Sequence, residues 1–133
     1  VLGGGALSRV AGAAGGLGMR SAESMGDPGF HVWTGQSGQK YRYSVYMCGT
    51  VFGPGPANYI FARETRPGQY VPLYIGQTAD LSEPFDMPLV RECLKINRVT
   101  HIHVRYTDIR EELRRAERSD LISEWNPPCN EMR

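Results

Sequence analysis

The sequence predicts a small α+β domain, a mostly antiparallel sheet of three to five strands flanked by two main helices. Two observations carry this prediction. Short segments with the composition of strands occur in pairs separated by glycine-containing turns, and Lys40–Cys48 and Thr100–Thr107 also alternate apolar and polar residues as half-buried strands do. Two segments nearer the C-terminus instead repeat apolar residues at helical spacing. With 133 residues, the chain is long enough for one domain with a hydrophobic core.

The expected strands form two hairpins and one further strand. In chain order they are Phe30–Thr34, Lys40–Cys48, Asn58–Ala62, Tyr70–Ile75 and Thr100–Thr107. Turns at Gly35–Gly38 and Arg66–Gln69 join the first two strands and the next two. Pro72 lies inside the fourth segment. Because proline has no backbone N–H, it indicates that this strand is at an edge of the sheet or is bulged.

Two helices are expected in the C-terminal half. The first runs through Leu89–Ile96, with Asp80 or Ser82 as the capping residue. The second runs from Ile109 to Trp125, and Asp108 with Glu111 three residues later fits a capping box. The prolines that follow Asn126 end it. Its expected apolar face comprises Ile109, Leu113, Ala116, Leu121 or Ile122, and Trp125.

Residues 1–29 are rich in Gly, Ala and Ser, and we expect a flexible tail ahead of a domain that spans residues 30–133. Within the tail, the glycines of Gly12–Gly18 have the spacing of a dinucleotide-binding loop. Such a loop needs a strand before it and a helix after it. Ser8–Ala11 is a poor strand, and Gly26–Gly29 interrupts any helix, so the tail interpretation is preferred.

Charge and cysteine content limit the function classes. Fifteen basic and fourteen acidic residues give a net charge of +1, so only a local patch could attract nucleic acid. Cys48, Cys93 and Cys129 are odd in number and far apart, and we expect free thiols in a reducing compartment. No apolar run reaches the roughly 18 residues that a membrane span requires. These observations predict a cytoplasmic protein.

Short motifs follow one another along the C-terminal part of the chain. They are Ala57-Asn58-Tyr59, Tyr74-Ile75-Gly76, Gln77-Thr-Ala-Asp-Leu81, Leu121-Ile122 and Asn126-Pro-Pro-Cys-Asn130. In this order they resemble the GIY-YIG nuclease family, whose Gly-Ile-Tyr motif corresponds to the first and whose Tyr-Ile-Gly motif is intact in the second. The resemblance extends from about Val51 to the end of the sequence.

The resemblance implies a metal-dependent endonuclease that hydrolyses phosphodiester bonds of DNA. In that family one divalent ion, Mg²⁺ or Mn²⁺, polarises the phosphate. Tyr59 and Tyr74 would be the tyrosines that activate or position the water. Asn130 would be the asparagine that steadies the site, and Gly76 would keep the backbone compact beside the tyrosines.

Two positions depart from the family pattern. The family's phosphate-contacting arginine lies eight residues after the glycine of Tyr-Ile-Gly, where this chain has Pro84. The family's metal-binding glutamate lies three residues before the leucine of Leu-Ile, where this chain has Arg118. Glu117 is adjacent and is the candidate metal ligand, but one helical step of about 100° aims it elsewhere. Arg91 or Arg98 could replace the missing arginine.

The basic residues of the last helix and the histidines have alternative interpretations. Arg114, Arg115 and Arg118, with His103 in the same cleft, are candidate contacts to nucleic acid. Interleaved glutamates equally fit a solvated helix face, and His101 with His103 fits hydrogen-bonded strand residues. We therefore favour a nuclease-like fold with weak or lost catalysis that binds nucleic acid or protein. The alternatives are an active endonuclease and a chain without a nuclease-like role.

Overall fold

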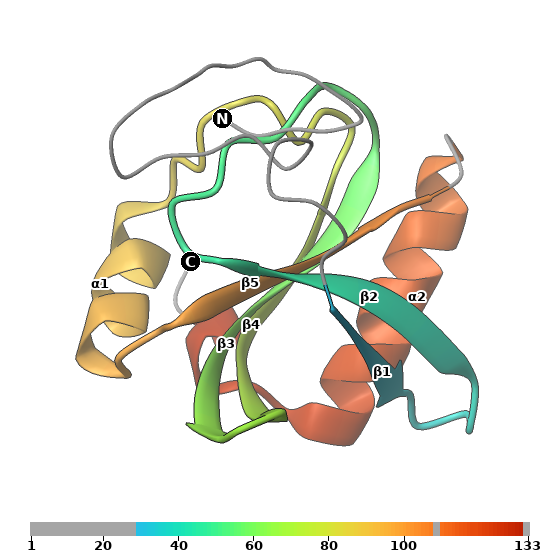
Figure 1. The fold of residues 1–133 in the computed structure, drawn as a ribbon. Helices are drawn as coiled ribbons and strands as arrows, with labels where there is room; N and C mark the ends of the chain where they lie inside the picture. Colours follow the sequence, from blue (N-terminus) through green and yellow to red (C-terminus); the bar gives the residue numbers. More distant parts are fainter. Residues whose placement is uncertain (1–28, 108–109, 132–133) are drawn as a thin grey trace.

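The computed structural model describes residues 29–107 and 110–131, and the tail predicted for residues 1–29 lies outside this range except for Gly29. The described chain forms a single five-stranded sheet with two α-helices (Figure 1). Every strand pair is antiparallel. The predicted α+β class, with its mostly antiparallel sheet and two main helices, is confirmed.

The sheet has the strand order β1-β2-β5-β3-β4. The strands are β1 (Phe30–Thr34), β2 (Lys40–Met47), β3 (Ala57–Arg66), β4 (Gln69–Thr78) and β5 (His101–Tyr106). Both expected hairpins form, and β5 lies between them. The sheet curls strongly. Although β1 and β4 are its two outer strands, the rings of His31 on β1 and Tyr70 on β4 are only 5.2 Å apart.

Pro72 marks both features that its position predicts. It lies in the edge strand β4, and the register with β3 shifts there: Phe61 pairs with Tyr74, whereas Ala62 pairs with Pro72. Leu73 is the extra residue of this β-bulge. Side chains alternate along the facing part of β3, where Tyr59 and Phe61 point to one face of the sheet and Ile60 to the other.

The helices are α1 (Pro88–Ile96), α2 (Glu111–Trp125) and the short 3₁₀ helix η2 (Pro128–Glu131). The expected cap of the first helix is wrong: Met87 precedes its first turn, and Pro88 occupies the position where proline needs no N–H partner. Asp80 instead accepts hydrogen bonds from Ser82 in the preceding loop. Asp108 and Ile109 lie outside the described residues, and Arg110 precedes α2.

Each face of the sheet carries its own core. On one face Tyr59, Tyr74, Leu73 and Val104 pack with Val90 and Leu94 of α1. On the other face, Trp33, Tyr43, Ile60 and Ile75 pack with Leu121 of α2. The two helices therefore cover opposite faces of the sheet (Figure 1). Any side chain on α2 is separated from the Tyr59 face unless it passes the edge of the sheet.

The buried face of α2 is not the predicted apolar face. Leu113 and Trp125 are largely exposed, whereas Arg114, Glu117 and Leu121 are buried. These three buried residues have helical spacing, but two of them, Arg114 and Glu117, are charged. Charged groups remain buried only when partners satisfy them, and both of these side chains have such partners.

The prediction of three free thiols is also wrong. Cys93 of α1 and Cys129 of η2 form a disulfide, with their Cα atoms 5.8 Å apart, and only Cys48 among the described cysteines is free. The two cysteines are 36 residues apart in the sequence, so their spacing did not indicate a pair. They become neighbours only because η2 packs beside α1.

Within the described residues, no helix combines the length and apolar character needed to cross a membrane.

Candidate functional site

Tyr59 and Tyr74 lie side by side on the α1 face of the sheet. Both side chains are buried, and their ring centroids are 6.2 Å apart. The rings come together because Tyr59 pairs with Gly76 and Phe61 pairs with Tyr74 across β3 and β4. Phe85, from the loop before α1, lies edge-on to both tyrosines at 6.2 and 5.9 Å. The structure therefore brings together the two tyrosines that the motifs indicate.

Burial makes the Tyr59 hydroxyl difficult to ionise. Loss of solvent raises its pKa well above the ordinary value, and a hydrogen bond with Tyr74 acts in the same direction. The positive charge of Arg118 partly opposes this rise. The Tyr74 hydroxyl donates to the sulfur of Met87 at 3.8 Å. At neutral pH Tyr59 is therefore a neutral hydrogen-bonding group rather than a ready base.

Asn130 holds the backbone between the two tyrosine motifs. Its Oδ1 accepts from the Ile75 N–H at 2.9 Å, and its Nδ2 donates to the Ile75 carbonyl at 2.8 Å. Ile75 lies in the outer strand β4, so Asn130 supplies the two hydrogen bonds that a further strand would supply. Asn130 therefore contacts the tyrosine motif through the backbone of Ile75, which lies between Tyr74 and Gly76 in the chain.

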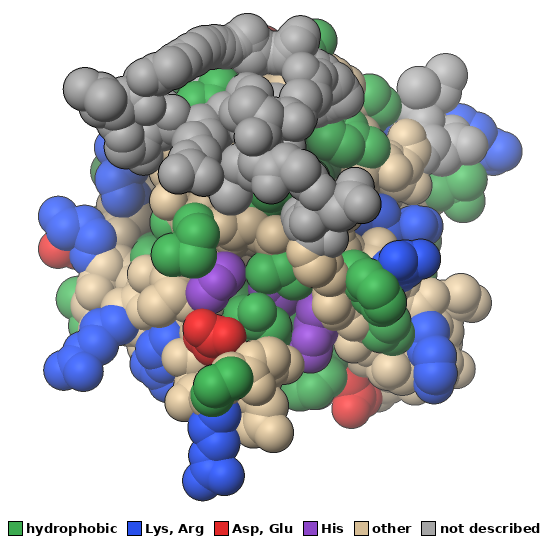
Figure 2. Space-filling model, in the orientation of Figure 1, with side chains coloured by type: hydrophobic (Ala, Val, Ile, Leu, Met, Phe, Trp, Pro, Cys, Tyr) green, Lys and Arg blue, Asp and Glu red, His purple; other side chains and the backbone are tan. Residues whose placement is uncertain are grey.

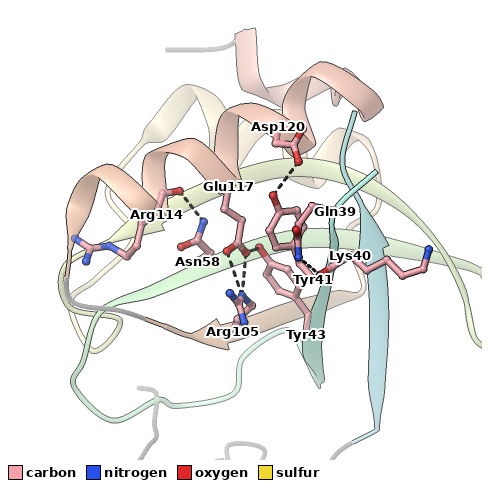
Figure 3. Close-up of polar contacts among 9 residues, drawn as sticks. All are labelled: Gln39, Lys40, Tyr41, Tyr43, Asn58, Arg105, Arg114, Glu117 and Asp120. Atoms are coloured by element: carbon pink, nitrogen blue, oxygen red, sulfur yellow. Dashed lines mark hydrogen bonds and ion pairs between the residues drawn. The ribbon is translucent and has the colours of Figure 1, made fainter. Parts of the chain in front are cut away.

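Glu117 points to the opposite face of the sheet. Its carboxylate accepts a hydrogen bond from the Tyr43 hydroxyl at 2.5 Å and pairs with Arg105 Nε at 3.1 and 3.2 Å (Figure 3). Asn58 shares this polar cluster, because its Nδ2 donates to the carbonyl of Arg114 at 3.0 Å. Asn58 immediately precedes Tyr59, so strand alternation separates Glu117 from the tyrosines.

This arrangement does not fit a divalent metal held by Glu117 beside Tyr59 and Tyr74. Both carboxylate oxygens already have charged or hydroxyl partners, and the side chain is only 6% exposed. In the described parts of the chain, no group of three or more His, Cys, Asp or Glu is arranged to hold a metal. Arg118, at the position of the family glutamate, acts electrostatically on Tyr59 instead.

The candidate nucleic-acid contacts do not form one surface. Arg114 is buried and donates to Gln77 at 3.0 Å, whereas Arg115 is exposed and pairs with Glu111 at 2.6 Å. Arg118 is half-buried, and its positive charge acts electrostatically on the Tyr59 hydroxyl. His103 is completely buried, and its Nδ1 accepts from Trp33 Nε1 at 2.9 Å. The ring of His103 therefore has no exposed edge to offer a phosphate.

Pro84 stands where the cleft would need a cation. It lines a cavity of about 640 Å³ next to Tyr59, within the sequence Glu83-Pro-Phe-Asp86. Of the suggested replacements, Arg91 donates to the Phe85 carbonyl at 2.5 Å, and Arg98 follows α1 with left-handed backbone geometry. Neither Arg91 nor Arg98 lines the cavity.

The polar network on the α2 face escaped the sequence interpretation. Besides Glu117 and Arg105, Asp120 accepts from the Tyr41 hydroxyl at 2.8 Å (Figure 3), and it also accepts from the Ser37 hydroxyl. These bonds lower the pKa of Asp120. Burial, followed by the hydrogen bond to Asp120, raises the pKa of Tyr41 to about 12. Partners some 80 positions apart leave no local signal, and Tyr41 and Tyr43 belong to the apolar half of the alternation in the second strand.

Comparison with known proteins gives no family assignment: no family model matches the chain, and neither does any curated protein or solved structure. The fold class follows from the structure itself, and the resemblance to GIY-YIG nucleases rests on the motifs.

Proposed function

We propose that this domain is a nuclease-like module that binds a macromolecular partner and does not hydrolyse phosphodiester bonds. The observation that carries the proposal is the position of Glu117, whose carboxylate is neutralised by Arg105 on the face of the sheet away from Tyr59 and Tyr74. A buried carboxylate with its charge and hydrogen bonds satisfied has little tendency to leave them for a metal ion.

The remaining chemistry of the tyrosine face supports binding over hydrolysis. Burial keeps Tyr59 protonated, which disfavours its use as a general base near neutral pH. Pro84 has no charge or donor to stabilise a phosphate, and Arg118 places a cation where the family resemblance implies a metal ligand. Asn130 and Gly76 nevertheless maintain the backbone and ring packing around Tyr59 and Tyr74. A protein that binds a partner without hydrolysis could still use this arrangement.

A protein is the favoured partner, with DNA as the second candidate. The cavity beside Tyr59 is lined by Asp80, Glu83 and Asp86 and by no described Lys, Arg or His, which suits a phosphate backbone poorly. One observation favours DNA: the positive charge of Arg118 lies close enough to act on the Tyr59 hydroxyl. A phosphate bound at Arg118 would make one basic contact, whereas DNA binding usually uses a groove with several basic residues.

A plasmid-nicking assay with Mg²⁺ or Mn²⁺ tests the loss of hydrolysis. We expect no nicking by the native chain. Three proteins are compared: the native chain, Tyr74→Phe, and the double variant Pro84→Arg/Arg118→Glu, each shown to be folded by circular dichroism. Nicking by the native chain that Tyr74→Phe abolishes would overturn the proposal in favour of an active endonuclease. Activity gained only by the double variant would support a scaffold whose chemistry alone was lost.

Titration of a labelled DNA duplex at several salt concentrations tests the second candidate. Phosphate contacts release counterions, so genuine DNA binding weakens steeply as salt rises. Arg118→Gln compared with Arg115→Gln identifies the surface, because the charge of Arg118 acts on Tyr59 whereas Arg115 is exposed and paired with Glu111. Tight, salt-dependent binding that Arg118→Gln alone weakens would favour DNA over protein.

A further inference from the structure

The cavity beside Tyr59 has an aromatic floor. Tyr59, Phe61 and Phe85 line it, with ring centroids 5.8 Å apart for Tyr59–Phe61 and 5.2 Å for Phe61–Phe85. Phe52 and Met87 extend the apolar lining. A volume of about 640 Å³ is within the roughly 300–1,000 Å³ range of small-ligand and side-chain pockets. The faces of such rings carry partial negative charge and attract cations.

The rim of the same cavity is acidic. Asp80, Glu83 and Asp86 all line it, and Glu83 and Asp86 are exposed. Hydrogen bonds from Ser82 lower the pKa of Asp80, so this carboxylate stays ionised. Within the described chain, neither Glu83 nor Asp86 takes part in an ion pair. No ion pair with a described residue therefore offsets their charge.

We propose that this cavity binds a lysine or arginine side chain presented by a protein partner. The proposal rests on the proposed binding function and names its ligand. The aliphatic stem of such a side chain would lie against Phe61 and Phe85, and its charged end would lie among the rim carboxylates. The negative charge of the rim disfavours an anionic ligand such as a phosphate. A phosphate would be repelled by carboxylates on the segment where the GIY-YIG resemblance implies an arginine.

Fluorescence anisotropy on the full chain tests the ligand class. The probes are a fluorescein-labelled peptide of alternating lysine and alanine, the same peptide with glutamate in place of lysine, and a labelled DNA duplex. We compare the native chain with Glu83→Gln/Asp86→Asn, which removes two exposed charges without changing side-chain shape. The matched control Glu92→Gln/Glu124→Gln removes two exposed charges outside the cavity.

The native chain should bind the lysine peptide and not the glutamate peptide. Glu83→Gln/Asp86→Asn should weaken that binding about fivefold to tenfold, and the matched control should leave it nearly unchanged. Phe85→Ala should weaken it too, and this loss should persist at high salt, where charge effects alone are screened.

Three results would overturn the proposal. The first is equal weakening by the control pair, which would mean nonspecific attraction to surface acids. The second is no binding of the lysine peptide. The third is preferential binding of the duplex. The nicking assay is independent of all three, so a failed ligand assignment and a failed binding function are distinguishable.

Discussion

Gly76 lies directly against the ring of Tyr59, its partner across β3 and β4. A Cβ atom at residue 76 would stand 2.5 Å from Tyr59 Cζ, 2.6 Å from Tyr59 Oη and 2.9 Å from Tyr74 Cε2. Neither ring can move freely, because both are buried and Phe85 packs against them. The glycine of Tyr-Ile-Gly is thus explained by close packing with the tyrosine of the first motif.

Gly76→Ala should therefore destabilise the domain. Displacing the buried Tyr59 ring costs about 1–3 kcal/mol in the free energy of unfolding, as for other overpacked cores. Thermal unfolding of the two proteins measures the difference. Gly29→Ala is the control, because a Cβ at that residue meets nothing within 4 Å. Equal stability of native and Gly76→Ala chains would contradict the packing argument.

The strands were predictable because local sequence patterns mark them, and two of them carry an alternation of apolar and polar residues. Lys40–Met47 and His101–Tyr106 illustrate this, and both form where their patterns indicate. The place of β5 between the two hairpins was not predictable, because pairing depends on contacts between residues far apart in the chain. The same holds for Cys93 and Cys129, and for the curl of the sheet that brings His31 to Tyr70.

The site was predictable in part for the same reason. Tyr59, Tyr74 and Gly76 belong to motifs whose meaning is local to one hairpin, and the structure brings them together. The direction of Glu117 needed only the helical step, which placed it away from Arg118. Its actual partners, Arg105 and Tyr43, come from β5 and β2 and could not be found from spacing.

Asn130→Ala should loosen the outer strand at Ile75. Both backbone groups of Ile75 would lose their partner while the residue stays buried, which costs about 2–4 kcal/mol in the free energy of unfolding. Amide hydrogen exchange gives the local readout: the Ile75 N–H should exchange much faster, while the Ile60 N–H in β3 changes little. Uniform acceleration of both amides would show global destabilisation instead of a local clamp.

Reduction of the Cys93–Cys129 disulfide should lower stability. The bond closes a loop between residues 36 apart, and loop-closure entropy of that length corresponds to about 3–4 kcal/mol. Denaturant unfolding of the native chain and of Cys93→Ser/Cys129→Ser measures the effect, with Cys48→Ser as the control because Cys48 is free. A thiol titration of the folded, non-reduced chain that detects Cys93 and Cys129 would contradict the pairing.

The histidine cluster should make the domain less stable in mild acid. All three histidines lie near one another around Tyr70, and histidine side chains appear beside hydrophobic ones on the face drawn in Figure 2. Burial, and to a smaller extent the charges of the nearby His31 and His101, lower the pKa of His103 to about 3. Because its Nδ1 accepts from Trp33 Nε1, the neutral ring carries its proton on Nε2, which has no hydrogen-bond partner among the described residues. A second proton would have to enter at Nδ1 and would break the bond from Trp33.

The sign of the pH effect follows from comparing the two states. His103 takes up a proton near its ordinary pKa of 6.5 when unfolded, but only near 3 when folded, so its contribution is complete above about pH 6.5 and is lost as the pH falls toward 3. From about pH 7 to about pH 5, where carboxylates remain ionised, the loss is about 2 kcal/mol. Urea unfolding at a series of pH values measures it. His103→Gln keeps an acceptor for Trp33 and should flatten the slope, whereas His31→Gln should flatten it less, because His31 is only partly buried. An unchanged slope in His103→Gln would assign the acid sensitivity to other groups.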